Sequence, residues 1–258
     1  MLHGVRVGAA TTAEWSDLVD ELDRWGEAGR VAELWWRDDD VIGATTQLDR
    51  LLRLSDGIPI ALAVIPAQAR PELAGALSRT PRVAVVQHGW QHANRASHGK
   101  KSEYPEGRPG ALVGAEIGAG RARLKAMFRT RALPMLVPPW NRFAAEFLPL
   151  LPGIGIAAIS AMGSRHPRAL PPGLAAVDVH VDVVDWHGSR GFIGAAAALG
   201  SLIAHLRARR LGQASGPIGL LTHHLVMDDA TTAFLERLIA VTRAHAAIRW
   251  AAVSEVLQ

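Results

Sequence analysis

The stretch Val31-Ala-Glu-Leu-Trp-Trp36, continued by Arg37-Asp-Asp-Asp40, decides the fold of this sequence. Its first part is a short apolar run, which predicts a buried β-strand. The run ends abruptly in one basic and three acidic residues, so the strand delivers charge to its carboxyl end. Like charges this close repel one another, and a metal ion or Arg37 would have to compensate them. The stretch therefore predicts a strand with a functional site at its carboxyl end.

Strand-like and helix-like segments alternate after this stretch. Apolar residues at helical spacing predict the helices, and β-rich apolar runs predict the strands. The predicted strands are 31–36, 58–65, 83–87, 134–137, 154–160, 176–184 and 218–222; the predicted helices are 12–29, 45–54, 71–78, 116–128, 144–151, 192–209 and 231–245, with a turn region at 167–173. This repeated order favours an α/β fold, either a parallel barrel or a doubly wound sheet.

Length and composition favour a single domain over residues 1–258, with residues 1–30 as a helical N-terminal extension. The chain has 258 residues, and 49% of them are hydrophobic, which is enough for a large core. Lysine and arginine number 28 against 24 acids, and they are scattered, so no nucleic-acid partner is expected. The sequence has no cysteine, so any metal ion must be held by His, Asp or Glu.

No membrane partner is expected either. Met1–Trp15 lacks the basic start and apolar run of a secretory signal. No uninterrupted apolar stretch approaches the ~18 residues that a membrane span needs. A cytoplasmic location is the expectation from these two observations.

Polar residues follow five of the predicted strands at the point where each strand ends. Parallel α/β folds place their sites at the carboxyl ends of strands, so these residues are expected to meet at one mouth. The five groups are Arg37-Asp-Asp-Asp40, His88 with His92, Pro138-Pro-Trp-Asn-Arg142, Asp182 with Asp185-Trp186, and His223-His224.

His88 and His92 are candidate metal ligands. If Gly89 begins a helical turn, side chains four apart share one face and can grip one ion. Two imidazoles and one carboxylate from Asp38–Asp40 describe a catalytic zinc or related divalent site. Taken alone, the His pair also fits a surface turn, and one aspartate also fits a helix N-cap.

The other strand ends suggest supporting roles. His223 or His224 is a candidate general acid, and only one of them should face the site because strand side chains alternate. Asp185 could orient a histidine, with Trp186 as a pocket wall. The extended backbone at Pro138-Pro139 could present an amide to an oxyanion near Trp140. Core packing of the tryptophans and a merely stiff proline loop are the alternatives.

In this order, the segments resemble the motifs of the polysaccharide deacetylases of carbohydrate esterase family 4, the NodB homology domain, over about residues 31–258. The family's first motif is Thr-Phe-Asp-Asp, in which the first Asp is the catalytic base and the second binds metal. Aligned on the last two acids, Asp39 would be the base and Asp40 the ligand. A shift by one residue, with Asp38 as base and Asp39 as ligand, is the alternative.

The remaining motifs match to different degrees. His88-Gly-Trp-Gln-His92 is similar to the metal-binding motif His-(Ser/Thr)-x-x-His, with Gly89 in place of the hydroxyl residue. Val137-Pro-Pro-Trp-Asn-Arg142 lacks the leading arginine of the third motif, which normally steadies the base; Arg37 and Arg142 are the candidates to replace it. Asp182-Val-Val-Asp-Trp186 resembles the fourth motif, and Leu221-Thr-His223 resembles the fifth, which supplies the general acid.

The resemblance implies a distorted parallel (β/α) barrel of about seven strands and a metal-dependent hydrolase. The expected reaction removes an N-acetyl or O-acetyl group from an amino sugar, a saccharide or a similar amide. Zinc is the expected ion, with Co²⁺, Ni²⁺ and Mn²⁺ as alternatives. The implied site comprises the ligands Asp40, His88 and His92, the catalytic groups Asp39 or Asp38 and His223 or His224, and the substrate or support residues Arg37, Pro139, Trp140, Asn141, Arg142, Asp185 and Trp186.

Two departures bear on the substrate. The altered first and third motifs and the absent signal favour a smaller, intracellular substrate over an exported peptidoglycan or chitin deacetylase, and the loop 94–110 is expected to shape specificity. The alternative functions are a metal-dependent C–N hydrolase of a small non-sugar amide and a non-catalytic saccharide-binding relative. The expected partner is a small molecule or a saccharide, and the oligomeric state is left open.

Overall fold

Strand β1 (Ala32–Val41) runs through the middle of the protein and continues through the whole acidic triplet. The computed structural model describes residues 12–163 and 170–257. The other strands are β2 (Ile60–Val64), β3 (Val83–His88), β4 (Ala132–Val137), β5 (Ala158–Ile159), β6 (Ala175–Ala176), β7 (Val181–Asp182), β8 (Ile218–Thr222) and β9 (Ile248–Trp250). The α-helices are α1 (Trp15–Glu27), α2 (Thr46–Leu54), α3 (Glu72–Leu77), α4 (Gly110–Phe128), α5 (Ala195–Arg210), α6 (Asp229–Ala244) and α7 (Val253–Val256).

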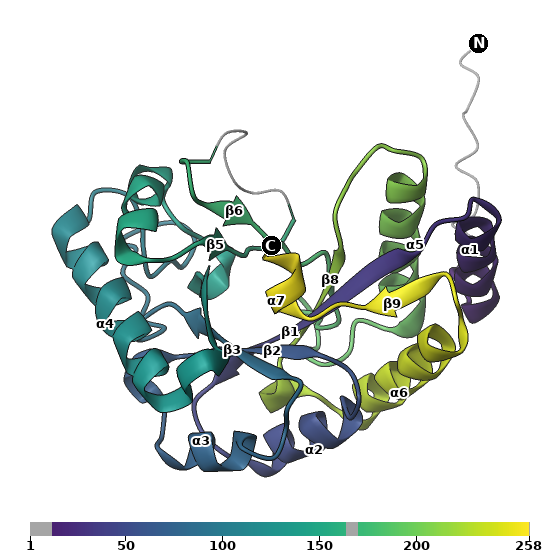
Figure 1. The fold of residues 1–258 in the computed structure, drawn as a ribbon, viewed down its shortest axis with the longest axis horizontal. Helices are drawn as coiled ribbons and strands as arrows, with labels where there is room; N and C mark the ends of the chain where they lie inside the picture. Colours follow the sequence, from purple (N-terminus) through teal and green to yellow (C-terminus); the bar gives the residue numbers. More distant parts are fainter. Residues whose placement is uncertain (1–11, 164–169, 258) are drawn as a thin grey trace.

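The strands form one parallel sheet in the order β6-β5-β4-β3-β2-β1-β8-β7, and β9 pairs with the first half of β1. Its two edge strands belong to one segment, residues 175–182, whose start pairs with β5 and whose end pairs with β8. This segment joins the two ends of the strand order, so the sheet curls into a distorted half-barrel (Figure 1). The predicted α/β fold with a distorted parallel barrel is confirmed.

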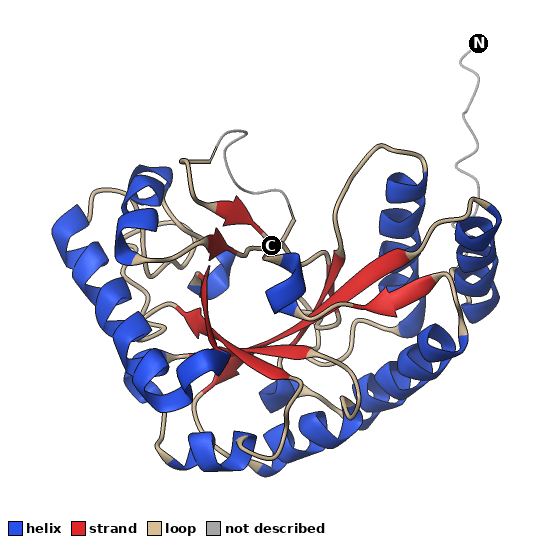
Figure 2. Cartoon of the chain, viewed as in Figure 1, coloured by secondary structure: helices blue, strands red, loops and turns tan. Residues whose placement is uncertain are grey.

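The curled sheet has an inner face and an outer face, and β1 contributes to both. Its side chains alternate between the two faces, as in any strand. Trp35 belongs to an inner cluster with Ala63 and Val137, whereas Trp36 belongs to the larger cluster between the sheet and the surrounding helices (Figure 2). Helix α7 adds Val253 to the inner cluster. The inner cluster fills the middle of the curled sheet, so a cavity can open only beyond it, at the carboxyl ends of the strands.

Several predicted boundaries are wrong, for local reasons. The sheet has nine strands in the described residues rather than about seven, because β9 was not predicted and the predicted strand 176–184 is split into β6 and β7. The segment predicted as a helix over 144–151 is a 3₁₀ helix (Ala145–Leu150), since Pro149 has no amide hydrogen to donate. Pro152 begins a further 3₁₀ turn, which shortens the predicted strand 154–160 to β5.

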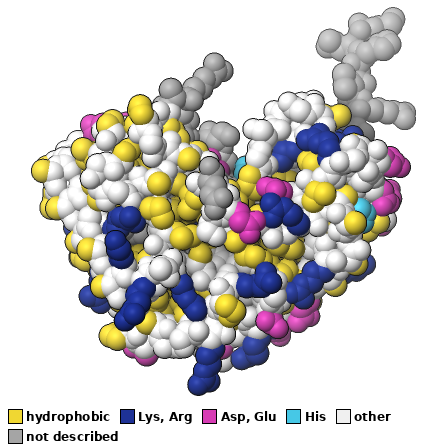
Figure 3. Space-filling model, in the orientation of Figure 1, with side chains coloured by type: hydrophobic (Ala, Val, Ile, Leu, Met, Phe, Trp, Pro, Cys, Tyr) yellow, Lys and Arg dark blue, Asp and Glu magenta, His cyan; other side chains and the backbone are white. Residues whose placement is uncertain are grey.

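Two other predictions concern the ends and a loop. The predicted N-terminal extension contains α1 within residues 12–30, and residues 1–11 lie outside the described part. The predicted turn region 167–173 is described only from residue 170. On the face seen in Figure 3, Lys and Arg side chains are dispersed among apolar ones. Across the described segments, no helix combines the length and the apolar character that crossing a membrane requires.

Candidate functional site

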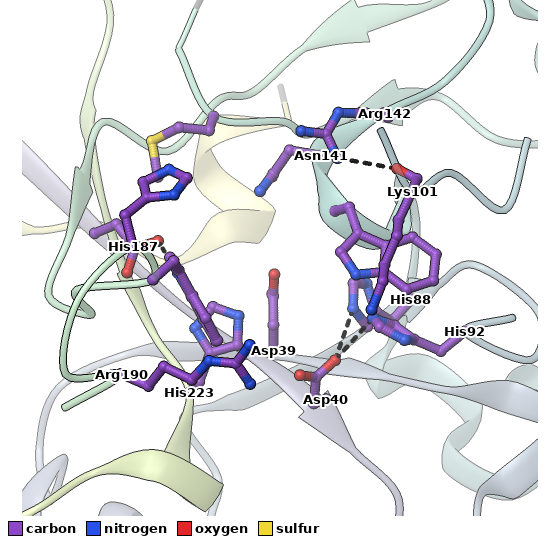
Figure 4. Close-up of a pocket in the computed structure, with 14 residues that line it drawn as sticks. Asp39, Asp40, His88, His92, Lys101, Asn141, Arg142, His187, Arg190 and His223 are labelled. Carbon is purple, nitrogen blue, oxygen red and sulfur yellow. Dashed lines mark hydrogen bonds and ion pairs between the residues drawn. The ribbon is translucent and has the colours of Figure 1, made fainter. Parts of the chain in front are cut away.

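A cavity of about 640 Å³ opens at the carboxyl ends of the strands. Figure 4 shows side chains from the ends of β1, β3, β4, β7 and β8 converging on it. The lining residues are Asp39, Asp40, His88, His92, Lys101, Trp140, Asn141, Arg142, Met162, Asp182, Trp186, His187, Arg190 and His223. The five predicted strand ends therefore meet at one mouth.

The three aspartates of β1 point to three different places. Asp39 continues the inner row of Trp35 and Arg37 and lines the cavity. Asp38 lies on the opposite, helix-covered face. The β1–β2 register shifts between Asp38 and Val41, and Asp40 has φ 68°. Such an irregularity re-aims a side chain, and aspartate tolerates the left-handed region better than most residues. This local change turns Asp40 toward the histidines of β3.

Asp40, His88 and His92 form a compact cluster. One carboxylate oxygen, Oδ1 of Asp40, lies 3.1 Å from Nε2 of His88 and 3.3 Å from Nε2 of His92. Nδ1 of His88 is 2.9 Å from the carbonyl oxygen of Val137, to which it can donate. Burial acts to raise the pKa of Asp40, but the hydrogen bond and charge of His88 hold that pKa well below its usual range. Asp40 is therefore a carboxylate anion that lies between the imidazoles of His88 and His92.

This donor set fits a divalent ion. A neutral His88 that donates from Nδ1 has a lone pair on Nε2, and that lone pair faces a carboxylate oxygen. In this tautomer Nε2 and the carboxylate oxygen are two acceptors 3.1 Å apart, a contact that a bound cation or a proton on Nε2 stabilises. Ligands about 2.0–2.2 Å from a tetrahedral ion are themselves about 3.3–3.6 Å apart, slightly more than the observed 3.1 and 3.3 Å. Asp40, His88 and His92 can therefore hold a divalent metal ion.

The turn between the two histidines is not helical, contrary to the prediction from their spacing. Gly89 has φ 57° and His92 has φ 56°, both in the left-handed region. The buried carboxylate of Glu103 accepts hydrogen bonds from the amides of Trp90 (3.0 Å) and Gln91 (2.7 Å). Both imidazoles therefore reach Asp40 because Glu103 holds the turn from a neighbouring loop, and not because the turn is helical.

Asp39 is held by Arg37, two residues earlier on the same strand. The guanidinium donates to both carboxylate oxygens, from Nε at 2.8 Å and from Nη2 at 2.9 Å. It also donates to Ser160 Oγ at 2.6 Å and to Asn141 Oδ1 at 3.0 Å, and it is fully buried. Arg37 thus contacts the carboxylate that the missing third-motif arginine would steady. Arg142, the other candidate, donates to the carbonyl of Lys101.

Asp38 and His224 pair with each other away from the cavity. Nδ1 of His224 lies 2.6 Å from one oxygen of Asp38, and the hydroxyl of Thr222 donates to the other oxygen at 2.6 Å. Both Asp38 and His224 are buried. Burial raises the pKa of Asp38, against the hydrogen bond from His224. The structure therefore places Asp38 and His224 behind the site, and Asp39 and His223 in it.

His223 faces the cavity beside Trp186 and Asp182. The rings of His223 and Trp186 meet edge to face at 4.7 Å between centroids. Trp186 Nε1 donates to Asp182 at 2.8 Å, and the charge of His223 opposes the burial that raises the pKa of Asp182. Nδ1 of His223 is buried without a hydrogen-bond partner among the described residues, a costly state that is typical of functional sites.

Asp185 has a different position from the one its motif suggested. Its carboxylate accepts hydrogen bonds from the amides of Gly188 (2.9 Å) and Ser189 (3.2 Å) and so closes its own loop. Asp182 is the carboxylate that lies beside a histidine. The sequence analysis named Asp185 for that place because it follows the predicted strand 176–184 directly, next to Trp186.

The proline-rich turn after β4 forms the wall next to the metal ligands. Trp140 and Asn141 have φ 56° and 54°, a strained arrangement that bends the chain after Pro139. The Trp140 ring packs on the His92 ring at 4.4 Å between centroids. The Asn141 amide donates to the Pro138 carbonyl, and the Arg142 amide to that of Pro139.

Several residues of the site were missed in the sequence. Most of them lie in loops or short strands without a motif, and Thr222 stands within the Leu221-Thr-His223 motif without having been given a role. They are Lys101, Glu103, Ser160, Met162, His187, Arg190 and Thr222. The acidic Glu103 within the basic, glycine-rich loop 94–110 is the one signal that could have found a member of this set.

No protein-family model matches the sequence, and no curated protein matches it. Solved structures do match. A candidate polysaccharide deacetylase from Mycobacterium smegmatis is similar with a TM-score of 0.68 and 20% identity, over 89% of this chain and 90% of that one. A family 4 acetyl xylan esterase from Clostridium thermocellum, solved with a cobalt ion, gives 0.54 and 13%, over 87% and 89%.

A third similar structure is a carbohydrate esterase family 4 pseudoenzyme from Bacillus anthracis. Its TM-score is 0.56 at 12% identity, over 88% of this chain and 66% of that one. At these identities the likeness establishes the fold. The chain has the fold of the carbohydrate esterase family 4 polysaccharide deacetylases and diverges from them in sequence.

Proposed function

Because this chain combines the polysaccharide deacetylase fold with an Asp-His-His cluster, we propose that it is a metal-dependent deacetylase. The reaction is hydrolysis of the acyl bond of an N-acetylated or O-acetylated saccharide or a similar amide. The observation that carries the proposal is the convergence of Asp40, His88 and His92 beside a second carboxylate, Asp39. A ligand cluster next to a separate general-base candidate is what hydrolysis by an activated water requires.

Asp40, His88 and His92 would hold the ion, which in this proposal is zinc or a related divalent cation. When bound, such an ion polarises the acyl carbonyl and acidifies a water molecule. The donation from His88 Nδ1 to Val137 fixes that ring with Nε2 toward the ion position. Three protein ligands would leave room at the ion for water and substrate.

Asp39 is the proposed general base. It lines the cavity next to the ligands, and two hydrogen bonds from Arg37 fix the plane of its carboxylate. A fixed carboxylate can take the proton of the attacking water without reorienting. The alternative assignment, Asp38 as base with Asp39 as ligand, is not favoured by the position of Asp38 on the other face of the strand.

His223 is the proposed general acid, which would give a proton to the leaving amine. It lines the cavity from the end of β8, opposite the ligands from β3 (Figure 4). An imidazole suits this step near neutral pH. Trp140 and Trp186 would form the walls for the acyl group and sugar ring, and an amide of the Trp140 turn would donate to the oxyanion.

Release of acetate tests the proposal. We expect protein reconstituted with Zn²⁺ or Co²⁺ to release acetate from N-acetylated oligosaccharides, and dialysis against a chelator to abolish this release. Adding the ion back should restore it, with circular dichroism checking that the metal-free protein stays folded. Acetate release that persists after the chelator has removed all metal would contradict the mechanism.

Two other functions make different predictions in the same assay. A C–N hydrolase of small non-sugar amides would hydrolyse simple N-acetyl amides faster than any saccharide. A non-catalytic saccharide-binding relative would bind ion and sugar without turnover, and the pseudoenzyme with this fold makes it a specific alternative. The intact pairing of Asp39 with Arg37 favours the catalytic function.

A further inference from the structure

The charges around the cavity are unequal once the acids of the site have their partners. Asp39 is paired with Arg37, and Asp40 lies between two histidines as a metal ligand. Lys101 and Arg190 also line the cavity, and Asp182 is the one further acid among the described lining residues. A divalent ion would add positive charge, so the loaded cavity is cationic.

The basic side chains come from different loops and surround the cavity. Lys101 follows β3 and Arg190 follows β7, and Figure 4 shows them on opposite sides of Asp39 and Asp40. Neither has an ion-pair partner within 4.0 Å among the acids that the structure describes. A negatively charged group placed between Lys101 and Arg190 would be attracted by both side chains.

The loop that carries Arg190 is held in one conformation by hydrogen bonds to Asp185. The Asp185 carboxylate accepts the amides of Gly188 and Ser189, and the Arg190 amide donates to the Asp185 carbonyl at 2.9 Å. A Cβ on Gly188 would lie 2.2 Å from an Asp185 oxygen, so a side chain at this position would displace the Asp185 carboxylate. Arg190 itself has φ 59°, in the left-handed region that non-glycine residues rarely adopt.

We propose that the substrate carries an anionic group, a carboxylate or a phosphate, which Lys101 and Arg190 bind at the mouth. This inference rests on the proposed deacetylase function. It narrows the substrate from acetylated saccharides in general to those that bear a negative charge near the acetyl group. Long-range attraction of this kind also accelerates association at low ionic strength.

Three N-acetyl sugars test the proposal: N-acetylglucosamine, its 6-phosphate, and N-acetylmuramic acid, which carries a carboxylate. We expect kcat/KM of an anionic sugar to exceed that of the neutral one at least about 10-fold at low salt, and the ratio to fall as salt screens the charges. Which anionic sugar is preferred identifies the group. A ratio of one or less for both would overturn the proposal.

Variants assign the preference to residues. Arg190→Gln and Lys101→Gln should each reduce the anionic-to-neutral ratio about 3- to 10-fold, whereas Arg53→Gln, an equal charge change on exposed α2, should not change it. An unchanged ratio in both cavity variants would refute the assignment. If no sugar is hydrolysed, the deacetylase function fails, and calorimetric binding of glucosamine 6-phosphate against glucosamine to Zn²⁺-loaded protein still tests the anion site.

A second inference concerns Glu103, and its evidence is independent of the first. Its side chain is buried, and it accepts hydrogen bonds from the amides of Trp90, Gln91 and Ala93, the last at 3.4 Å. These amides belong to the turn that joins the two metal-ligand histidines and to the residue just after it. One carboxylate thus fixes the backbone of the whole turn.

Gly89 is matched to this carboxylate. A Cβ at Gly89 would lie 2.0 Å from Oε2 of Glu103 and 2.7 Å from the Pro139 ring, and φ is positive there. A side chain at position 89 and the carboxylate of Glu103 therefore exclude each other.

We infer that Glu103 is a positioning residue that sets the affinity of the site for its metal ion. Support for metal ligands from outside the coordination sphere typically changes affinity 10- to 100-fold. Glu103→Ala should therefore weaken calorimetric Zn²⁺ binding by about that factor. Glu103→Gln keeps the shape and one acceptor oxygen, so it should fold and weaken binding less than Glu103→Ala does. It should still weaken binding, because its NH2 group faces a backbone N–H of the turn.

Two further readouts separate positioning from general stability. The visible spectrum of bound Co²⁺ should change in Glu103→Ala, because the histidines shift, and Glu106→Gln on the same loop should leave both spectrum and affinity unchanged. Gly89→Ser should be harmful alone and less so when combined with Glu103→Ala, which relieves the clash. Zn²⁺ affinity and a Co²⁺ spectrum equal to those of the natural protein in Glu103→Ala would overturn the inference.

Discussion

Asp39→Asn is expected to lower kcat for acetate release about 1,000-fold while the protein still binds its metal ion. Asparagine has the shape of aspartate but cannot take a proton from water, and a general base contributes about 10²- to 10⁴-fold. The ligands Asp40, His88 and His92 are unchanged, so the loss should appear in kcat and not in metal content. Steady-state kinetics and metal analysis of the same preparation measure both.

A control for this variant is available in the same hydrogen-bond network. Ser160→Ala removes another partner of Arg37 without touching the base, and should cost less than about 10-fold. Asp39→Asn also leaves the buried Arg37 without its anion, so its thermal unfolding must be followed to exclude unfolding as the cause. An Asp39→Asn protein that stays folded and metal-loaded and keeps most of its activity would remove Asp39 from the base role.

Asp38→Ala is expected to lower the free energy of unfolding by about 3–5 kcal/mol, the usual cost of breaking a buried pair. It removes the acceptor of both His224 Nδ1 and the Thr222 hydroxyl, and these groups would be left buried without it. Because these two residues flank His223, their displacement should also reduce activity. Denaturant unfolding followed by tryptophan fluorescence measures the stability.

The matched control is Asp20→Ala, an exposed aspartate on α1, where surface substitutions usually stay within about 0.5 kcal/mol. A comparison of Asp38→Ala with Asp39→Asn also separates the two registers of the acidic triplet. Loss of metal from Asp39→Asn, together with a stable but inactive Asp38→Ala, would favour the alternative register with Asp38 as base.

The order of strands and helices was predictable because apolar periodicity is local. Once parallel strands are expected, their carboxyl ends have to meet, and this brings His88 and His92 to a carboxylate of Asp38–Asp40. The choice of Asp40 came from the motif resemblance, with a shift by one residue as the alternative. The identity of the neighbouring histidines followed less directly: either His223 or His224 could face the site, and only the path of the chain after β8 decides between them.

The supporting residues could not be predicted, because their contacts join segments far apart in sequence. Glu103 reaches the histidine turn from a loop without regular structure, and Ser160 reaches Arg37 only through the curl of the sheet. The turn itself was mispredicted as helical, since spacing alone does not reveal positive φ at Gly89 and His92. Asp185 was placed by its position directly after the predicted strand 176–184, and its own loop amides bind it instead.

The most direct test of the account is the number of divalent ions bound per chain. Calorimetric titration of metal-free protein with Zn²⁺ should give one tight site, and His88→Ala should lose it while remaining folded by circular dichroism. Natural protein that binds no Zn²⁺ or Co²⁺, or a His88→Ala variant that still binds one ion with undiminished affinity, would contradict the proposal that Asp40, His88 and His92 hold a metal ion.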